Sequence, residues 1–393
     1  MLFRDQSQQR GRYFLGIQDA LKREGIGHPV MVIDRERLRA NCRAMRALWP
    51  KGMDLRIVAK SLPNVDLLRL VLDELDASGL MTFNAPMLGQ LAGCFPDHHQ
   101  LLGKPLSIND AARVLGTMDP AAKVTWLVDT EDRFHQYREL ARAQSRRLSI
   151  ALEIDVGLHR GGLATDQLAA VVRQFADQTD LTFGGLMGYE PHIGGLPEFF
   201  GLRKRALAHT RAAYKAAVSI CAAQFGDDFL CNGGGSASYF YHLDDTCLSE
   251  MSVGSVLVKP TDFDLAENQD VLPAAFIAAP VLKKYNGFAI PGGDGRRAWL
   301  HRVNPNLSQV LFIHGGYWKA VPEDPPGLRQ SGIFGRSTNQ EALTLGRRAD
   351  IRVDDFVFLR PTQSERVLTQ FGDIVVYENG QVVDYWPAMP TTP

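Results

Sequence analysis

Residues 149–176, SIALEIDVGLHRGGLATDQLAAVVRQFA, hold the arrangement that decides the fold. The apolar run at 149–155 predicts a strand, a glycine-rich loop follows it, and residues 165–176 place apolar side chains at helical spacing. The strand is apolar on both faces, which is typical of a parallel strand covered by helices. A strand, a loop and a helix in this order form the unit from which parallel α/β folds are built.

Similar units occur along the first two-thirds of the chain. Seven further strand-like runs, with helical patterns between them, lie at 29–34, 55–59, 79–83, 100–104, 123–129, 183–189 and 228–232. With residues 149–155 they make eight strands, which predicts a closed (β/α)8 TIM-type barrel. An open doubly wound sheet produces the same pattern and stays the alternative.

The pattern changes after about residue 265, where strand-like runs follow one another without helical stretches of comparable length. Asn379-Gly380 lies between two such runs and predicts a hairpin turn. We therefore predict an α/β protein of two domains. The barrel is expected over residues 1–264, with an N-terminal extension over about 1–28, and a β-rich C-terminal domain is expected over 265–393.

Composition excludes several classes of protein. The chain has 393 residues, with 43 Lys and Arg against 44 Asp and Glu, a net charge of −1. This balance gives no electrostatic reason to bind nucleic acid or an anionic membrane surface. No run approaches the ~18 apolar residues of a spanning helix. Five cysteines without CxxC spacing indicate reduced thiols. We predict a cytoplasmic protein with neither nucleic acid nor membrane as partner.

Functional residues of a barrel gather where its strands end. Lys60 follows the apolar residues of the run at 55–59, where an amine either extends to solvent or acts as a nucleophile in a pocket. Arg160 lies in the loop after residues 149–155, and an internal salt bridge is the alternative explanation for the charges there. Tyr189 and His192 follow the seventh strand, and a purely structural histidine is the alternative for His192.

Two glycine turns follow in the motifs NGGGSAS and SVGS. Gly234 and Gly235 let the backbone approach a ligand and point N–H groups at an anion, and Ser236 adds a hydroxyl. Gly254 and Ser255 are positioned to close the same site. Neither motif is GxGxxG or GK[ST], which argues against a dinucleotide or a nucleoside triphosphate, and a plain tight turn is the alternative. An amine, a phosphate cradle, an arginine and a tyrosine at successive strand ends together indicate pyridoxal phosphate.

With these motifs, the sequence resembles the fold-type III pyridoxal-phosphate enzymes. It is most similar to the branch of D-threonine aldolase and eukaryotic-type D-serine dehydratase, and alanine racemase is a more distant relative. The matching segments are 57–61, 153–162, 185–192, 231–238, 252–258 and 372–387. The resemblance therefore spans nearly the whole chain.

The resemblance implies a role for each strand-end residue. By it, Lys60 forms the Schiff base and later acts as the base at Cα, Arg160 holds the phenolic oxygen of the cofactor, and the Tyr189 ring lies against the pyridine. The phosphate ligands would be Gly234, Gly235, Ser236, Gly254 and Ser255. Ser252 stands where racemases place the arginine beside the pyridine nitrogen. The resemblance also implies a small amino-acid substrate and a head-to-tail homodimer, in which the C-terminal domain over 265–393 completes the active site.

The sequence differs from the aldolase and dehydratase branch at the residues of a metal site. The aldolase and dehydratase branch carries a divalent-metal site in its C-terminal domain, built from a His-x-Cys pair near a Ser-Asp-Glu-His stretch. Gln363 and Glu365 stand at the positions of the pair, and residues 337–341 replace the stretch. Loss of the soft ligands argues against zinc. Mg²⁺ or Mn²⁺ on Glu365 with water ligands is the alternative. We predict no metal at these degenerate positions.

We predict a pyridoxal-phosphate-dependent lyase, of aldolase or dehydratase type, that acts on a β-hydroxy D-amino acid. Lys60, Tyr189 and His192 are the predicted catalytic residues. Without the metal, another group must act on the β-hydroxyl of the substrate. His192, Gln363 and Glu365 are the candidates by position, with Glu365 as a general base.

Two other functions stay open. In a racemase or epimerase, Lys60 would serve one face of the substrate, and a tyrosine from the partner subunit, such as Tyr285 or Tyr317, would serve the other. A pyridoxal-phosphate-binding protein without turnover is the second alternative. The full β-rich domain argues against it, because small carriers of that kind consist of the barrel alone. Substrate specificity is expected in residues 314–341, and residues 283–299 are a candidate lid.

Overall fold

The computed structural model describes residues 2–197, 199–244, 246–289, 292, 297–298 and 304–389, so part of the candidate lid lies outside the described residues. The chain forms two compact units. The first, here called the barrel unit, consists mainly of Cys42–Leu257 with Leu265–Asn268. The second, called the sheet unit, joins the chain up to Asn41 to Val258–Asp264 and Gln269–Met389.

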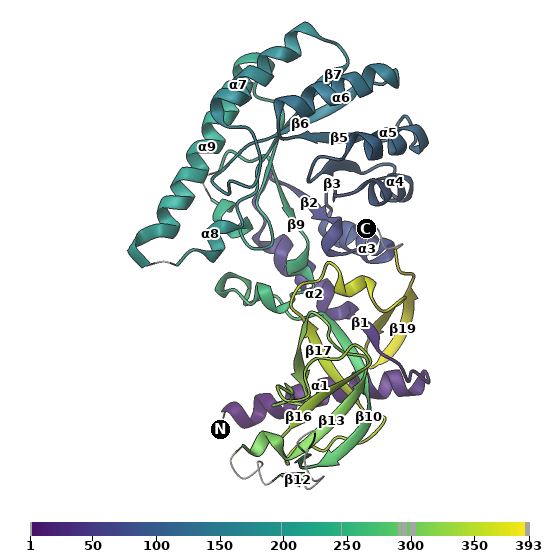
Figure 1. The fold of residues 1–393 in the computed structure, drawn as a ribbon. Coiled ribbons are helices and arrows are strands. Elements are labelled where there is room, and N and C mark those ends of the chain that lie inside the picture. The colour runs from purple at the N-terminus through teal and green to yellow at the C-terminus, as the bar shows by residue number, and fades with distance from the viewer. Residues whose placement is uncertain are drawn as a thin grey trace. The chain divides into compact units, whose positions relative to one another are not determined.

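The barrel unit is a closed ring of eight parallel strands, which confirms the predicted barrel (Figure 1). Its strands are β2 (Asp54–Val58), β3 (Gly79–Thr82), β4 (His99–Leu102), β5 (Val124–Val128), β6 (Leu148–Glu153), β7 (Leu181–Met187), β8 (Leu230–Gly233) and β9 (Glu250–Val253). In β5, every residue is buried, as expected for a strand with side chains both inside the ring and under helices. All the strands run in parallel, so their carboxyl ends meet at one mouth of the barrel.

The structure differs from the prediction in one of the eight strands that form the barrel. Residues 29–34, expected as the first barrel strand, form β1 (Val30–Asp34) of the sheet unit, where β1 pairs with β10 (Ala275–Asn286) and β18 (Ile374–Glu378). The ring is closed instead by β9, which pairs with β2 and β8. Both β1 and β9 are buried on both faces. Periodicity therefore recognises such a strand as buried without indicating the sheet that it joins.

Helices alternate with the strands of the ring. They are α3 (Val65–Leu75), α4 (Ala85–Cys94), α5 (Ile108–Thr117), α6 (Glu131–Ala143), α7 (Thr165–Gln174), the short α8 (His192–Gly195) and α9 (Leu202–Phe225). Another helix, α2 (Arg35–Leu48), begins in the sheet unit and ends in the barrel unit. Within the barrel unit, α4 lies beside α5, α5 beside α6, α6 beside α7 and α7 beside α9 (Figure 1). The helices α3 to α6 begin at Asn64, Asn84, Ser107 and Thr130, whose side chains accept a hydrogen bond from a backbone N–H of the first turn.

The sheet unit contains a mixed sheet, which confirms the predicted β-rich part of the chain. Besides β1, β10 and β18, its strands are β13 (Gln309–His314), β14 (Ala320–Asp324), β15 (Arg329–Gln330), β16 (Gln340–Leu345), β17 (Phe356–Pro361) and β19 (Gln381–Trp386). A separate pair is formed by β11 (Phe288–Ala289) and β12 (Arg297–Ala298). Asn379 and Gly380 join β18 to β19 with φ of 50° and 79°, the backbone that a two-residue Asn-Gly hairpin requires.

The N-terminal helix α1 (Leu2–Arg23) belongs to the sheet unit and not to the barrel that it was expected to extend. Phe14 and Ile17 of α1 are buried in one core with Phe276 and Phe358 of the sheet. The Phe14 ring centre lies 5.0 Å from that of Phe276 and 4.8 Å from that of Phe358. Aromatic burial of this kind stabilises the contact between helix and sheet.

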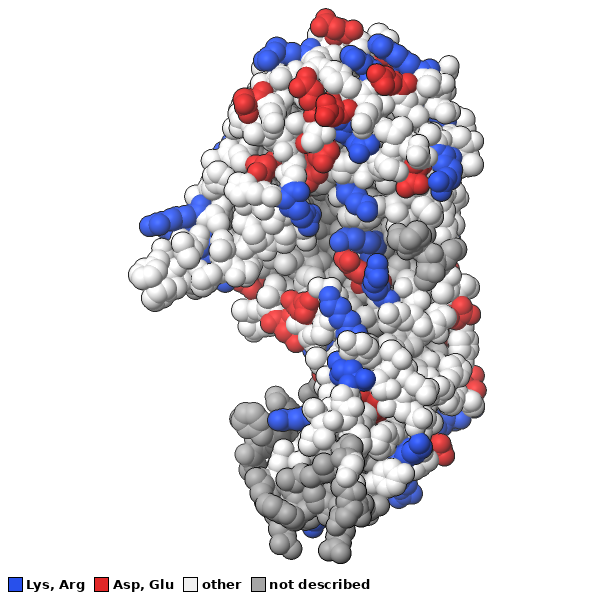
Figure 2. Space-filling view, in the orientation of Figure 1, with Lys and Arg blue, Asp and Glu red and all other residues white. Residues whose placement is uncertain are grey.

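Surface features bear on possible partners. Over the barrel unit, at the top of Figure 2, Lys and Arg side chains lie among Asp and Glu side chains. Among the described residues, the search for a helix with the length and apolar character needed to cross a membrane finds none.

Candidate active site

Lys60 lies at the carboxyl end of β2, where the strand turns into the short 3₁₀ helix η1 (Ala59–Ser61). Its ammonium is 4.8 Å from the centre of the Phe83 ring, which follows β3. A Cβ added at Gly103, after β4, would lie 2.4 Å from the Phe83 ring, so the ring needs a glycine there. The cation–π contact holds a half-buried amine at the barrel mouth, the position predicted for the nucleophile.

The loop after β6 is closed by its own contacts. The N–H of Leu163 donates to the carbonyl of Glu153 across the loop (2.8 Å). The Asp155 carboxylate accepts the backbone N–H of His159 (3.1 Å) and pairs with Nδ1 of the same residue (2.6 Å). His159 has a φ of 54°, which these contacts support. The loop therefore presents Arg160 from a fixed backbone.

Tyr189 lies between this loop and the first glycine turn. Its ring centre is 5.3 Å from Cζ of Arg160. On the other side, a Cβ added at Gly235 would lie 2.8 Å from Cε2 of the Tyr189 ring. The structure thus brings together three predicted site residues from the ends of β6, β7 and β8.

The two glycine turns are joined by one hydroxyl. Ser236 Oγ accepts hydrogen bonds from the N–H groups of Gly254 (3.2 Å) and Val256 (3.1 Å). A Cβ added at Gly254 would lie 2.8 Å from both Ser61 Cβ and the Val58 carbonyl oxygen, beside the turn that carries Lys60. The contacts therefore lead around the mouth from the Lys60 turn through both glycine turns to Tyr189 and Arg160.

This mouth fits pyridoxal phosphate. Within the described part of the chain, no acceptor is assigned to the N–H groups of Gly234, Gly235 and Ser236, and Gly234 has a φ of 72°. Converging N–H groups in such a turn bind an anion. Ser255 begins the 3₁₀ helix η5 (Ser255–Leu257) at the second turn. An anion cradle, an amine and an arginine match the phosphate, the aldehyde and the phenolic oxygen of the cofactor.

His192 is the predicted residue that lies apart from this series of contacts. It begins α8, and its Nε2 is 3.4 Å from the place of a Cβ added at Gly157, in the loop after β6. Burial lowers its pKa, so the ring is neutral near pH 7. Its Nδ1 is buried without a hydrogen-bond partner among the described residues. A neutral imidazole can accept a proton.

Glu190, a residue that the sequence analysis did not select, is fully buried directly after Tyr189. It accepts hydrogen bonds from Ser238 (2.7 Å) and Tyr214 (3.0 Å), and His242 Nε2 lies 3.4 Å away. Burial raises the pKa of Tyr214, which keeps its hydroxyl protonated as the donor. Glu190 therefore ties the end of β7 to the first glycine turn and to α9. A glutamate in a polar motif gives no sequence signal of burial.

Glu153, at the end of β6, is a further residue that the sequence analysis did not select. Burial, and then the nearby Asp129, raise its pKa to about 7, although Arg160 acts in the opposite direction. A carboxyl group with this pKa exchanges protons near neutrality. The signal in the sequence was a charge at the end of an apolar strand.

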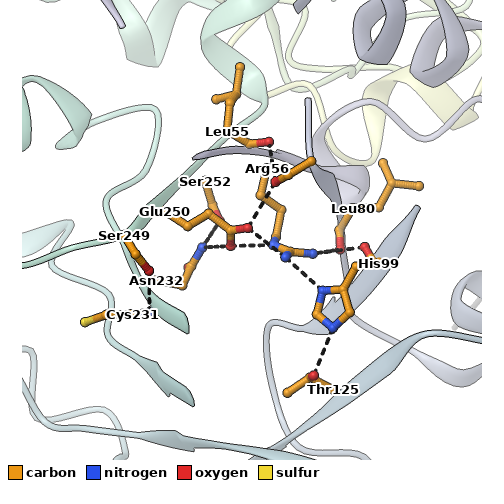
Figure 3. Close-up of polar contacts among 11 residues, drawn as sticks. Leu55, Arg56, Leu80, His99, Thr125, Cys231, Asn232, Ser249, Glu250 and Ser252 are labelled. Carbon is orange, nitrogen blue, oxygen red and sulfur yellow. Dashed lines mark hydrogen bonds and ion pairs between the residues drawn. The ribbon is translucent and has the colours of Figure 1, made fainter. Parts of the chain in front are cut away.

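Inside the barrel, a polar network supports β8 and β9 where they lead into the glycine turns (Figure 3). Arg56 of β2 donates to both carboxylate oxygens of Glu250 (2.5 and 2.7 Å), and both side chains are 2% exposed. Asn232 Nδ2 donates to Glu250 (2.6 Å) and to Ser252 Oγ (2.8 Å). Ser252 therefore has the neutral Asn232 amide as its partner, and its predicted place near the pyridine nitrogen stays a prediction.

The same network includes a neutral histidine. Arg56 Nη2 donates to His99 Nδ1 (2.9 Å), and His99 Nε2 is hydrogen-bonded to Thr125 (2.9 Å). Because a guanidinium only donates, His99 Nδ1 accepts and Nε2 carries the proton. Burial, and then the charge of Arg56, lower the pKa of His99 to about 4.

The remaining predicted residues lie in the sheet unit. Gln363 and Glu365 follow β17. Gln363 Oε1 accepts a hydrogen bond from Lys319. Tyr285 lies on β10 and is 43% exposed, and Tyr317, which follows β13, is 61% exposed. Among the described residues, no cluster of His, Cys, Asp and Glu has the arrangement of a metal site.

An amine, an Arg–Tyr contact and a glycine cradle at the mouth of a (β/α)8 barrel, on a chain with a further sheet unit, define the fold-type III class of pyridoxal-phosphate proteins. The sequence profile described as "Alanine racemase, N-terminal domain" matches residues 33–261. The chain belongs to this family, which is pyridoxal-phosphate-dependent.

Individual relatives are aldolases and a dehydratase. D-threonine aldolase of an Arthrobacter species is 25% identical over 274 residues, which cover 66% of this chain and 69% of the relative. The 3-hydroxy-D-aspartate aldolase of Paracoccus denitrificans is 27% identical over 161 residues, only 41% of either chain. The structure of D-threo-3-hydroxyaspartate dehydratase from Delftia sp. HT23 superposes with a TM-score of 0.73 at 16% identity, covering 92% of this chain and 97% of that one, and shows the shared fold.

Proposed function

We propose that this chain is a pyridoxal-phosphate-dependent lyase that acts on a β-hydroxy D-amino acid. The continuous series of contacts from the Lys60 turn through Ser236 and Gly235 to Tyr189 and Arg160 carries the proposal. It joins the amine, the anion cradle and the ring cover that this cofactor requires. Both relatives named by sequence act on amino acids with a hydroxyl at the β carbon, which supports the substrate class.

Each residue has a distinct task in this proposal. Lys60 would hold pyridoxal phosphate through its aldehyde until the amino group of a substrate replaces the Lys60 amine, and the cofactor would then draw electrons from the bonds at the α carbon. The Lys60 amine released in this exchange would move the proton at Cα, Arg160 would hold the anionic oxygen of the ring, and the Tyr189 ring would cover one face. The neutral His192 takes the proton of the β-hydroxyl.

The first test is the absorption spectrum of the purified protein with pyridoxal phosphate, before and after borohydride, followed by peptide mapping. We expect a visible band that disappears on reduction and a pyridoxyl adduct on Lys60. Lys60→Ala should lose the adduct, whereas Lys123→Ala, at an exposed lysine before β5, should keep it. A protein that stays colourless, or an adduct on another lysine, would contradict the assignment of Lys60.

The second test separates the possible reactions. The protein is incubated with D-threonine and with the isomers of 3-hydroxyaspartate. An aldehyde with glycine indicates aldol cleavage, and a 2-oxo acid with ammonia indicates dehydration. Release of neither product class from any β-hydroxy D-amino acid would contradict the lyase. Sedimentation analysis of the same sample tests the proposed homodimer.

A racemase is the second candidate, because the family profile is that of alanine racemase. It predicts that alanine or serine of one hand is converted to the other, with deuterium from heavy water entering at Cα. Deuterium incorporation at Cα without inversion of the amino acid's configuration would exclude the racemase, since a racemase needs an acid or base on each face of the substrate.

A further inference from the structure

In the sheet unit, two cationic side chains donate hydrogen bonds to oxygen atoms at the degenerate metal positions, those of Gln363 and Glu341. Gln363 replaces the histidine of the His-x-Cys pair, and its Oε1 accepts a hydrogen bond from Lys319 Nζ. Both side chains are exposed, so the contact lies at the surface of the unit. The Gln363 amide that accepts from Lys319 is neutral, so this hydrogen bond does not cancel the charge of the ammonium.

In the second degenerate segment, residues 337–341, the carboxylate of Glu341 likewise accepts a hydrogen bond from a cationic side chain, Arg336. Glu341 is fully buried and accepts a hydrogen bond from Arg336 Nε and another from the N–H of Tyr317 (2.8 Å). A Cβ added at Gly316 would lie 2.3 Å from Glu341 Cβ, so a glycine is needed to bring this N–H to the carboxylate. Both carboxylate oxygens therefore already have donors.

The two cations are anchored to one short piece of backbone. Arg336 Nη2 donates to the carbonyl of Trp318 (3.3 Å). The next carbonyl, that of Lys319, accepts the N–H of Thr362 (2.9 Å), which directly precedes Gln363. The Lys319–Gln363 and Arg336–Glu341 pairs are thus tied to two consecutive residues just before β14. Together the two pairs are here called the cation cluster.

A divalent metal binds oxygen, nitrogen or sulfur atoms and would have to displace the hydrogen bonds that these atoms accept. In the cation cluster, the amide oxygen of Gln363 and the oxygens of Glu341 accept from Lys319, Arg336 and a backbone N–H. Arg336 is paired with Glu341, and a metal ion in this place would also meet the positive charge of Lys319, which repels it. The donor set does not fit the metal of the related branch.

We propose that Lys319 and Arg336 occupy the place of the divalent cation of the related branch, so that this chain binds no metal ion at Gln363 and Glu341. The ammonium of Lys319 donates to Gln363, and the guanidinium of Arg336 donates to Glu341. The occupation of the metal position by Lys319 is tested without any substrate or cofactor.

The test is zinc binding by titration calorimetry and elemental analysis, with reductant present, on folded full-length protein. Wild type is expected to retain no equivalent of zinc. The double variant Gln363→His with Glu365→Cys restores the two soft ligands, and we expect it to bind zinc weakly because Lys319 is still present. In a triple variant that also carries Lys319→Ala, the dissociation constant of zinc should fall at least tenfold. Lys284→Ala is the matched control, because Lys284 Nζ donates to the carbonyl of Ile351 (2.6 Å) in the same unit, outside residues 337–341 and 363–365.

Two results would overturn the inference: a stoichiometric metal in wild type, or equal zinc affinity of the restored site with and without Lys319. A thermal unfolding scan shows that each variant is folded. The visible absorption band of bound pyridoxal phosphate is recorded in parallel. Loss of that band in wild type would count against the proposed function, whereas the zinc affinities would still decide the cation cluster.

Discussion

Ser236 Oγ accepts the N–H of Gly254 at 3.2 Å and so joins the two glycine turns at the barrel mouth. It also accepts the N–H of Val256 (3.1 Å). One hydroxyl therefore sets the spacing of the turns that would hold the cofactor phosphate.

Ser236→Ala removes this acceptor and leaves two N–H groups without it. We expect the dissociation constant of pyridoxal phosphate to rise at least tenfold, about 1.4 kcal/mol, because a lost hydrogen bond of this kind costs about 1–3 kcal/mol. Fluorescence titration with the cofactor measures the change. Ser219→Ala, on the exposed face of α9, is the control and should bind as wild type does. Equal affinities of both variants would show that Ser236 does not organise the cradle.

Gly235→Ala places a methyl group 2.8 Å from the Tyr189 ring. Because this is closer than real Cβ contacts, the ring or the turn must move, and we expect loss of most cofactor binding with little change in far-ultraviolet circular dichroism. Gly93→Ala is the control, since a Cβ there meets no atom within 4 Å. It should keep the cofactor and raise helix stability slightly. Unchanged cofactor affinity in Gly235→Ala would contradict the contact between Tyr189 and the turn.

Glu250→Gln breaks the ion pair with Arg56 inside the barrel. We expect the free energy of unfolding to fall by about 3–5 kcal/mol, because an unpaired buried guanidinium remains. Urea unfolding measures the loss. Asp180→Asn, which removes the exposed partner of Arg142, should cost less than about 1 kcal/mol. If Glu250→Gln costs no more than Asp180→Asn, the network does not contribute to stability as described.

His99 should make the barrel less stable in acid. Its folded-state pKa of about 4 lies below the value of an unfolded histidine, so the unfolded chain binds more protons between about pH 6.5 and pH 4. Stability is therefore lost as the pH falls through this window. Glu153 has the opposite sign, because its raised pKa of about 7 penalises the folded state as the pH rises from about 4.5 to 7.

Urea unfolding at pH 7 and pH 5 measures both contributions. His99→Gln should reduce the loss of stability at pH 5, and Glu153→Gln should increase the difference between the two values. Ser219→Ala, which changes no titratable group on α9, is the control and should leave the pH dependence as in wild type. A His99→Gln variant with the same pH dependence as Ser219→Ala would contradict the neutral buried state of His99.

Much of the barrel and its mouth followed from the sequence alone. Buried parallel strands, helical periodicity and glycine turns are local patterns, and barrel topology places functional residues at strand ends. For that reason Lys60, Arg160, Tyr189 and the two glycine turns were found by their positions in the chain, and the structure places them in one series of contacts.

The tertiary structure decided what depends on pairing between distant residues. Local pattern does not distinguish β1 from a barrel strand, because both are buried on two faces, and only ring closure assigns β9 to the barrel. The same holds for Glu190, whose charge predicts exposure but whose partners come from three other segments. Lys319 and Gln363 are 44 residues apart and meet only because β14 and β17 pair side by side. Local periodicity does not predict such contacts between residues distant in the sequence, because these contacts follow from the topology of the folded chain.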